Sequence, residues 1–563
     1  MNKTPNAYLE KAGWSYVPKY LFVTGGVMSG LGKGITTSSV AKLLQLSGVE
    51  VTCLKIDPYL NFDAGTMNPY THGEVFVTDD GGETDMDLGN YERFLNRNMT
   101  KANNITTGQI YKKVIDDERR GRFLGKSVQI IPHVTDEIKR RIREIAEKEG
   151  TEILVVECGG TVGDIESLPF LEAFRQMRME EGPAKTLFLH VSLAPELAVV
   201  GEMKTKPTQH SVQEMRRIGI QPDIIVIRGT RGLPAEAKEK ISLFTSVPLE
   251  SVISDPDVET IYQVPRLLER EGVLKPIQRQ LRIRSRLSMS AWNAVAEKYL
   301  DHEITVRIAM VGKYANLADS YVSVNQALTH AGAVNGANIR ITWIESEEIE
   351  KDESKLDLMD GYDGVVLPQG FGSRGIEGKI SAANKARTSG IPFLGLCYGF
   401  QLASVAFARH VLGLKGANTT EADPSTPHPV IDLLPEQREV TDLGGTMRLG
   451  GHDVHIEKPS RAYDIYRTDK IRERHRHRFE LNQKYLKRFE ERGMRYTAFS
   501  DSGRRAEILE LEGHPFYMGT QYHPEYISRP ERPEPIYVAF VEACAKRARE
   551  VSKGPEKVKP LSR

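Results

Sequence analysis

Cysteine is scarce in this sequence, which has four cysteines among 563 residues. Their spacing matches neither a zinc-binding pattern nor a disulfide framework, and a chain of this length does not need disulfide bonds to stabilise its core. We therefore expect reduced thiols and a cytoplasmic location. Cys53, Cys158 and Cys544 are expected to be buried core residues, whereas Cys397 lies in a motif that indicates another role.

An excess of charge of either sign is also missing, because 76 basic residues balance 76 acidic residues. This balance gives no electrostatic reason to expect a nucleic-acid or membrane partner. No run approaches the roughly 18 apolar residues that a transmembrane helix needs, and residues 1–19 lack the apolar core of a secretory signal. The length and composition predict a globular protein of several domains.

Short apolar runs alternate with helical patterns along most of the chain. This alternation is typical of doubly wound parallel sheets, which bind ligands at the carboxyl ends of their strands. The strands expected in a first α/β series are 20–24, 51–56, 152–157, 186–191 and 223–228. The strands expected in a second series are 306–311, 364–368, 392–396 and 516–521.

The two series set the predicted domain boundaries. We expect an N-terminal extension at 1–19, a first α/β domain at 20–283, a linker at 284–304, a second α/β domain at 305–550 and a charged tail at 551–563. The linker contains Ser and Arg and becomes helical near 291–300. The tail is rich in charge and contains proline, which is typical of disorder.

A short motif surrounds Cys397. Gly395-Leu-Cys-Tyr-Gly399 follows an apolar run and precedes a helical stretch at 400–407. This is the arrangement of a nucleophile elbow with Cys in place of Ser, in which a strained turn and close neighbours require glycine. The nucleophile then lies at a helix N-terminus, where the helix dipole favours the thiolate. Taken alone, the motif fits a buried core cysteine equally well.

A base and a carboxylate for this thiol follow later in the chain. In Tyr522-His-Pro-Glu525, His523 can take the thiol proton while Glu525 orients the imidazole ring. The two motifs together favour a catalytic triad of Cys397, His523 and Glu525 over a structural cysteine and a turn histidine.

Residues from about 306 to 541 resemble the class I glutamine amidotransferases. The resemblance implies that the Cys397 thiolate attacks the glutamine carboxamide, releases ammonia and leaves a glutamyl thioester for water. It also implies that the backbone N–H groups of Gly370 and Tyr398 hold the oxyanion. Gln369 stands where the family usually has glycine, which reduces the conformational freedom of that loop.

The same resemblance implies the contacts of the substrate. Glu421 and Arg478 match positions that bind the amino and carboxylate groups of glutamine, and this pair of opposite charges suits a zwitterion. Gln401 is a further residue assigned to this binding site.

A glycine-rich segment, Thr24 to Gly34, joins the first expected strand to a helix. Glycines allow backbone N–H groups to face phosphate oxygens, and Lys33 adds a positive charge. The segment departs from the standard P-loop, since Val27 replaces the first glycine and Gly34 replaces the Ser or Thr that would bind magnesium. The pattern alone leaves a nucleotide site and a structural turn open, within a P-loop-type doubly wound sheet.

Loss of that hydroxyl means that a magnesium ion must find other oxygen ligands. Asp87 and Glu157 are the candidates, because Glu157 ends an expected strand and carboxylates at that edge can reach a bound triphosphate. Without the glycine-rich segment, both would be read as ordinary solvated carboxylates.

Five further segments, together with both sites, resemble the CTP synthase family over about residues 20–541. The segments are Lys55–Tyr59, His72–Val77, Gly160–Pro169, Gly201–His210 and Arg474–Arg478. The resemblance implies formation of CTP from UTP, ATP and glutamine, with phosphorylation of the UTP O4 followed by displacement of the phosphate by ammonia. It also implies Mg²⁺, GTP as an activator, CTP as a feedback inhibitor, and homotetramers, which in some members polymerise into filaments.

The resemblance assigns the nucleotide contacts residue by residue. The contacts with the ATP phosphates are assigned to Ser29, Gly30, Leu31, Gly32, Lys33, Gly34, Ile35 and Lys55. The contacts with the UTP triphosphate are assigned to Lys204, Thr205, Lys206, Pro207, Thr208, Gln209 and Lys240. The contacts with the product CTP are assigned to Asp164, Ile165 and Glu166. The contacts with the adenine are assigned to Asp257 and Val258.

Two residues, His72 and Val75, match the lining of the family's ammonia passage, although a capping histidine and a core valine fit the sequence too. Arg374 is a candidate contact for GTP. A different ATP-dependent amidoligase with a glutaminase domain is the main alternative, and a non-catalytic filament protein is a remote one.

Overall fold

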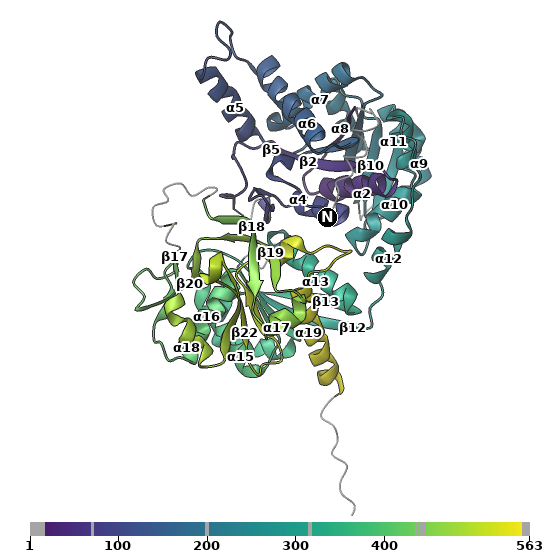
Figure 1. Ribbon diagram of the computed structural model, residues 1–563. Coiled ribbons are helices and arrows are strands. Elements are labelled where there is room, and N and C mark those ends of the chain that lie inside the picture. Colours follow the sequence, from purple (N-terminus) through teal and green to yellow (C-terminus); the bar gives the residue numbers. More distant parts are fainter. Residues whose placement is uncertain are drawn as a thin grey trace, which may run out of the picture. The chain divides into compact units, whose positions relative to one another are not determined.

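The computed structural model describes residues 17–68, 72–197, 202–313, 318–433, 437 and 446–553. Most of the predicted N-terminal extension, most of the predicted tail and Gly201 of the Gly201–His210 segment therefore lie outside the described residues. The chain forms two compact units (Figure 1). The first comprises residues up to Ala64 and Asp87–Ala296, and the second comprises Gly65–Met86 and the chain from Glu297 onward.

The first unit is built on a seven-stranded sheet in which every strand pairing is parallel. In spatial order the strands are β11 (Val252–Pro256), β10 (Ile224–Gly229), β7 (Thr186–Leu193), β1 (Lys19–Gly25), β6 (Ile153–Cys158), β2 (Val51–Asp57) and β5 (Asn104–Thr106). The doubly wound sheet expected from the sequence is confirmed, with β5 and β11 added at its edges. Its central strands are apolar on both faces because helices cover both faces.

Helices pack on the two faces of this sheet (Figure 1). Phe22 of β1 packs against Phe174 and Phe188, with ring centroids 4.4 and 5.4 Å away. The helices are α2 (Lys33–Leu46), α4 (Asp87–Leu95), α5 (Thr107–Arg119), α6 (Thr135–Lys148), α7 (Leu168–Glu181), α8 (Lys206–Arg217), α9 (Ala235–Thr245), α10 (Val264–Arg270), α11 (Leu274–Gln280) and α12 (Ser290–Lys298). Helix α12 confirms the helical stretch expected in the linker, and its Trp292 is buried in the first unit, where Nε1 donates to Tyr262 O.

The second unit contains a nine-stranded mixed sheet. In spatial order its strands are β13 (Ala337–Glu345), β12 (Ile304–Gly312), β14 (Gly364–Leu367), β15 (Phe393–Leu396), β23 (Tyr517–Thr520), β22 (Arg505–Leu511), β21 (Met494–Ser500), β18 (Arg448–Ile456) and β19 (Lys470–His477). Pairings from β13 to β23 are parallel and the remaining ones are antiparallel. Four strands of the parallel half match the second series expected from the sequence, whereas the edge strand β13 and the antiparallel half were not predicted.

Two apolar clusters fill the opposite faces of this sheet. The helices that supply them are α13 (Val322–Val334), α14 (Ser346–Lys351), α15 (Ile376–Ser389), α16 (Tyr398–His410), α17 (Arg461–Tyr466), α18 (Leu486–Glu490) and α19 (Pro535–Lys553). A small sheet of β16 (Ala417–Thr419), β17 (His428–Leu433) and β20 (Phe479–Leu481) lies beside it. No helix in the described parts of the chain is long and apolar enough to span a bilayer.

The segment 65–86 comes from the first half of the chain but packs within the second unit. Its hairpin, β3 (Val75–Val77) and β4 (Glu83–Asp85), contacts β19. Phe76 packs edge-on against Tyr526 at 5.1 Å, and Arg474 donates to Val77 O over 2.9 Å. The predicted boundaries did not separate this segment from the first domain.

Candidate active sites

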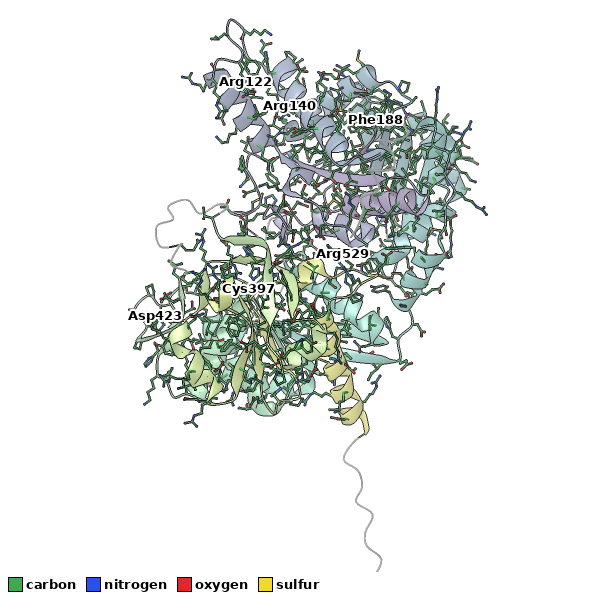
Figure 2. All side chains as sticks on the ribbon, in the orientation of Figure 1. Arg122, Arg140, Phe188, Cys397, Asp423 and Arg529 are labelled. Atoms are coloured by element: carbon green, nitrogen blue, oxygen red, sulfur yellow. The ribbon has the colours of Figure 1, made fainter. Side chains whose placement is uncertain are left out.

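The pairing of β15 with β23 brings the expected triad together. Leu396 is in register with Thr520 on these parallel strands, so Cys397 and His523 both follow the carboxyl edge of the sheet. Cys397 N donates to Thr520 O over 2.7 Å. Cys397, which is labelled in Figure 2, lies at the start of α16. Its backbone angles, φ 50° and ψ −97°, form the strained turn that a nucleophile elbow requires.

The glycines of the elbow are required by close backbone contacts. A Cβ at Gly399 would lie 2.0 Å from Leu367 O, and a Cβ at Gly395 would lie 2.8 Å from the backbone of Gly399. These approaches bring β14, β15 and α16 together around Cys397. The sequence motif therefore reflects steric necessity rather than a flexible turn.

The His523 ring is held by Glu525. Its Nδ1 lies 2.8 Å from Glu525 Oε1, while its Nε2 has no hydrogen-bond partner among the described residues. Burial by itself lowers the pKa of His523, but the Glu525 carboxylate and the Cys397 thiolate outweigh burial and raise this pKa to about 10. The arrangement favours an imidazolium paired with a thiolate, which is the activated form of a cysteine nucleophile.

A residue that sequence reasoning missed, Gln521, contacts the nucleophile. Gln401 Nε2 donates to Phe479 O over 2.7 Å and to Gln521 Oε1 over 3.1 Å. These contacts orient the Gln521 amide so that its Nε2 faces Cys397 Sγ at 3.7 Å. Gln401 Oε1 remains without a hydrogen-bond partner among the described residues, as expected for a group that can bind a substrate amide.

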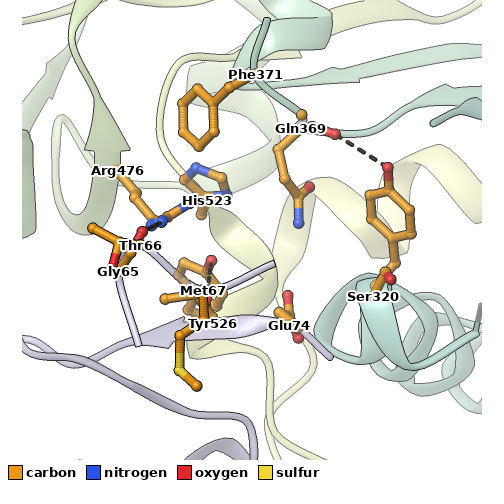
Figure 3. Close-up of a pocket in the computed structure, with 13 residues that line it drawn as sticks. Gly65, Thr66, Met67, Glu74, Ser320, Gln369, Phe371, Arg476, His523 and Tyr526 are labelled. Carbon is orange, nitrogen blue, oxygen red and sulfur yellow. Dashed lines mark hydrogen bonds between the residues drawn. The ribbon is translucent and has the colours of Figure 1, made fainter. Parts of the chain in front are cut away.

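The expected oxyanion loop borders a pocket of about 180 Å³ in the second unit (Figure 3). Gln369, Gly370 and His523 line it, together with Val75 and Arg476. Gly370 has φ 147°, and the side-chain oxygen of Gln369 is buried without a hydrogen-bond partner among the described residues. Val75 therefore lies at the pocket as a passage residue would, whereas His72 is exposed.

The two residues expected to bind the ends of glutamine lie near each other. Glu421 Oε1 accepts the N–H of Gly372 at 2.6 Å, and burial raises the pKa of Glu421 while the charges of Lys313 and Arg478 oppose this shift. Arg478 donates to Gln437 Oε1 and Thr446 Oγ1 over 3.1 and 2.9 Å. The Glu421 carboxylate and the Arg478 guanidinium are thus close enough to act on each other electrostatically.

The glycine-rich segment forms the turn between β1 and α2, with positive φ at Val27, Gly30 and Gly32. Lys33 Nζ donates to Gly160 O over 2.6 Å, and Val27 adopts φ 78° at the position where a P-loop has glycine. A Cβ at Gly34 would lie 1.8 Å from Asp87 Oδ1. The Asp87 carboxylate therefore fills the space of the missing P-loop hydroxyl, which the sequence could not reveal.

The carboxylates expected to bind magnesium surround Lys55. Its Nζ contacts Asp87 Oδ2 and lies 3.1 Å from Glu157 Oε1. Glu157 is fully buried and accepts the Tyr91 hydroxyl. Burial and the nearby Asp87 charge raise the pKa of Glu157, whereas Lys55 lowers it. Two carboxylates that repel each other beside a phosphate-binding loop fit a divalent cation.

The residues expected to bind UTP are partly gathered in one pocket of about 400 Å³, which is lined by Lys204, Thr205, Lys206 and Lys240. Thr208 is buried and donates to Leu193 O, and Gln209 donates to Thr205 Oγ1 over 3.0 Å. Thr208 and Gln209 thus support the start of α8, and neither they nor Pro207 line the pocket.

The remaining predicted contacts follow strands β6 and β11 at the carboxyl edge of the first sheet, and Ile165 and Glu166 lie in a short 3-10 helix. Asp164 Oδ2 accepts the Thr161 N–H at 2.7 Å, and Ile165 is largely exposed. Asp257 accepts Arg228 Nη2 at 2.7 Å, and Arg228 in turn lies close to Gly32 of the P-loop, which brings the adenine candidate near the phosphate loop.

Comparison with known proteins identifies the family. Residues 19–283 match the family model of the CTP synthase N-terminus, and residues 316–543 match that of class I glutamine amidotransferases. The CTP synthase of Pyrococcus furiosus is 56% identical over 528 residues, which cover 93% of this chain and 98% of that protein. The chain belongs to the CTP synthase family. The Archaeoglobus fulgidus member is 52% identical, over 94% of this chain and 99% of its own.

Family membership settles the alternatives left by the sequence. The chain is a CTP synthase family ligase that aminates UTP with nitrogen from glutamine at the expense of ATP, and not another amidoligase. The similarity to these relatives extends across both halves of the chain. The CTP synthase of Roseiflexus sp., for example, is 51% identical over 95% of the chain.

The magnesium assignment needs ligands beyond the protein. Among the described residues, no group of three or more His, Cys, Asp or Glu side chains is arranged to hold a metal ion. Asp87 and Glu157 supply two carboxylates, and Mg²⁺ commonly takes the rest of its octahedron from phosphate oxygens and water. The donor set fits an ion that arrives with the nucleotide.

Proposed function

We propose that Cys397, His523 and Glu525 hydrolyse glutamine in this CTP synthase family member. Glu525 keeps His523 protonated on the side of the thiolate, so that Cys397 attacks the carboxamide and His523 then protonates the leaving ammonia. The backbone N–H groups of Gly370 and Tyr398 stabilise the oxyanion. The 2.8 Å contact between His523 Nδ1 and Glu525, next to an elbow strained at Cys397, carries this proposal.

In the first unit, we propose that the segment 29–35 binds the ATP phosphates while Lys33 and Lys55 neutralise the charge that develops during phosphoryl transfer to UTP. Asp87 and Glu157 would hold Mg²⁺, which supplies charge neutralisation at the phosphates. The pocket containing Lys204 and Lys240 takes the UTP triphosphate. Product CTP contacts 164–166 and competes for that triphosphate site.

Further proposals concern transfer and regulation. Ammonia passes along a route that Val75 lines, with His72 at its exposed end. GTP activates glutamine hydrolysis and contacts Arg374, which is half exposed and paired with Glu347 at 2.8 Å. Assembly into homotetramers and a cytoplasmic location remain proposals that rest on the family and on the reduced, buried cysteines.

Variants at each site, assayed with two nitrogen sources, test this division of labour. Cys397→Ala should abolish CTP formation from glutamine and leave formation from ammonium unchanged. Lys33→Ala should stop CTP formation from both sources. CTP formation is measured by the absorbance change that accompanies conversion of uracil to cytosine. Loss of ammonium-dependent activity in Cys397→Ala would contradict separate sites, and retention of it in Lys33→Ala would make the glycine-rich segment structural.

A further inference from the structure

The loop 368–372, which carries the proposed oxyanion donor Gly370, is held from behind by buried side chains. It joins β14 to α15. Tyr321 is buried, and its hydroxyl lies 2.7 Å from Lys313 O and 3.4 Å from Gln369 O. The second contact is the dashed line that ends at Gln369 in Figure 3. The single hydroxyl proton is thus shared between two carbonyls, with the shorter contact at Lys313 after β12 and the longer one at Gln369 of the loop.

A second buried donor holds the preceding carbonyl. Lys379 of α15 has no exposed surface, and its Nζ donates to Pro368 O over 3.0 Å. The ammonium also lies 5.7 Å from the ring of Tyr398, the residue after the nucleophile. Burial lowers the pKa of Lys379 to about 7, with Lys313 lowering it further and the Cys397 thiolate opposing the shift, which places this ammonium within electrostatic reach of the reacting atoms.

Another peptide of the same loop shows how a donor on a carbonyl oxygen sets the direction of the N–H group in that peptide. In a planar trans peptide, the C=O and the following N–H point to opposite sides. Lys313 Nζ donates to Phe371 O over 2.7 Å, and the N–H of Gly372 on the opposite side donates to Glu421 over 2.6 Å. By the same rule, a donor on the carbonyl of Gln369 directs the N–H of Gly370 away from Tyr321.

We propose that Tyr321 and Lys379 are positioning residues for glutamine hydrolysis. Tyr321 contacts the carbonyl of Gln369 and so directs the Gly370 N–H toward the oxyanion, while Lys379 holds the carbonyl of Pro368 and so fixes the preceding peptide of the loop. The inference rests on the proposed role of Gly370 as an oxyanion donor. An oxyanion hole works only if its donors are oriented before the reaction. Glycine at 370 and a long side chain at 369 do not set that orientation by themselves, so the loop needs external anchors.

The test compares Tyr321→Phe with the parent chain in the presence of ATP and UTP. We expect kcat for glutamine hydrolysis to fall about tenfold with little change in KM, since one hydrogen bond that orients a transition-state donor is lost. The aldehyde analogue of glutamine adds the Cys397 thiol across its carbonyl and forms a thiohemiacetal, whose oxygen occupies the oxyanion position. Its inhibition constant should rise by the same factor.

Two controls separate positioning from folding. Tyr496→Phe removes another buried phenol hydroxyl of the same unit, which bonds Ser404 at 2.9 Å, and should leave kcat and aldehyde inhibition unchanged. Ammonium-dependent CTP formation should be equal in all variants. An unchanged kcat in Tyr321→Phe, or a lower kcat without weaker aldehyde inhibition, would overturn the inference.

Lys379→Met provides a second, independent variant. It should lower kcat for glutamine hydrolysis and weaken aldehyde inhibition in parallel, and the loss in the double variant with Tyr321→Phe should be smaller than the product of the single losses because both act on one loop. A loss in the double variant equal to the product of the single losses would contradict the idea that both residues act on one loop. Failure of the aldehyde to inhibit the parent chain would instead refute the proposed nucleophile, and this inference with it.

Discussion

At the scale of single residues, burial changes what an ordinary side chain does. Lys379, Lys313 and Gln521 lie in the sequence without any motif that marks them, yet each contacts the loop or the nucleophile of the glutaminase site. Their roles arise because a buried polar group must find a partner, and the partners available are the carbonyls and sulfur around Cys397. A lysine or glutamine in an expected helix or strand end would otherwise be read as solvated.

The triad predicts a pH-dependent reactivity of Cys397. Glu525 and the thiolate raise the pKa of His523 above its ordinary 6.5 to about 10, so the stability of the ion pair is fully present below pH 6.5 and is lost as the pH rises toward 10. Glu525→Gln removes the charge that contributes most to raising the pKa of His523 against the effect of burial, so this pKa falls. We therefore expect slower alkylation of Cys397 by iodoacetamide at pH 7, and glutamine-dependent activity reduced on the order of 10²–10⁴-fold.

Mass spectrometry of the alkylated peptide identifies the site, and we expect Cys397 to react first because burial raises the pKa of the Cys53, Cys158 and Cys544 thiols. Cys397→Ser is the control that should show no alkylation at this position. An alkylation rate in Glu525→Gln that equals the parent rate from pH 6 to 9 would show that Glu525 does not support the imidazolium.

At the scale of elements, two local departures from common patterns have physical causes in the fold. Gly34 departs from the P-loop motif because Asp87 at the start of α4 fills the space of a side chain. Strand β19 lacks an apolar alternation because both of its faces are paired with polar groups: Arg472, Arg474 and Arg476 face the segment 65–86, and His475 binds Glu507 at 2.9 Å. A pattern method based on hydrophobicity cannot find such a strand.

Restoring the common P-loop residue should therefore impair the enzyme. Gly34→Ser places new atoms against Asp87, and overpacking of this kind costs about 1–3 kcal/mol, so the apparent KM for ATP should rise at least about fivefold. The measurement is ammonium-dependent CTP formation against ATP concentration. Gly232→Ala, where a Cβ meets open space, is the matched control and should leave the KM unchanged. A lower KM in Gly34→Ser would mean that the hydroxyl binds the metal after all.

At the scale of the whole molecule, one segment of the first half of the chain is part of the second unit. Residues 65–86 contact β19 through three arginines at alternate positions, whose side chains share one face of the strand. The pocket beside His523 is lined by both Val75 of this segment and Gln369 of the oxyanion loop. Ammonia release and the start of its proposed route are therefore built into one compact unit.

The arginines of β19 should differ in how strongly they hold this segment. Arg474 is buried, donates to Val77 O and packs over Phe76, so Arg474→Met should lower the stability of the second unit by about 1.5–3 kcal/mol. It should also lower the ratio of CTP formed to glutamine hydrolysed. Arg472→Ala removes an ion pair to Asp79 that is exposed and worth about 0–1 kcal/mol, and should change neither quantity measurably.

Thermal denaturation and paired assays of glutamate and CTP measure the two effects. A normal ratio in an Arg474→Met variant that is destabilised would show that the segment does not guide ammonia. Equal effects of both substitutions would contradict the distinction between buried and exposed contacts.

Local patterns in the chain were enough to predict the two parallel α/β series, the elbow at Cys397 with His523 and Glu525, and the glycine-rich segment. These features are legible because steric and hydrophobic demands act over a few neighbouring residues, as the backbone contacts at Gly395 and Gly399 show. Three features are visible only in the folded chain: Asp87 occupies the space beside Gly34, buried lysines hold the loop 368–372, and residues 65–86 join the second unit. Each of these depends on contacts between segments far apart in the chain, for which no local pattern exists.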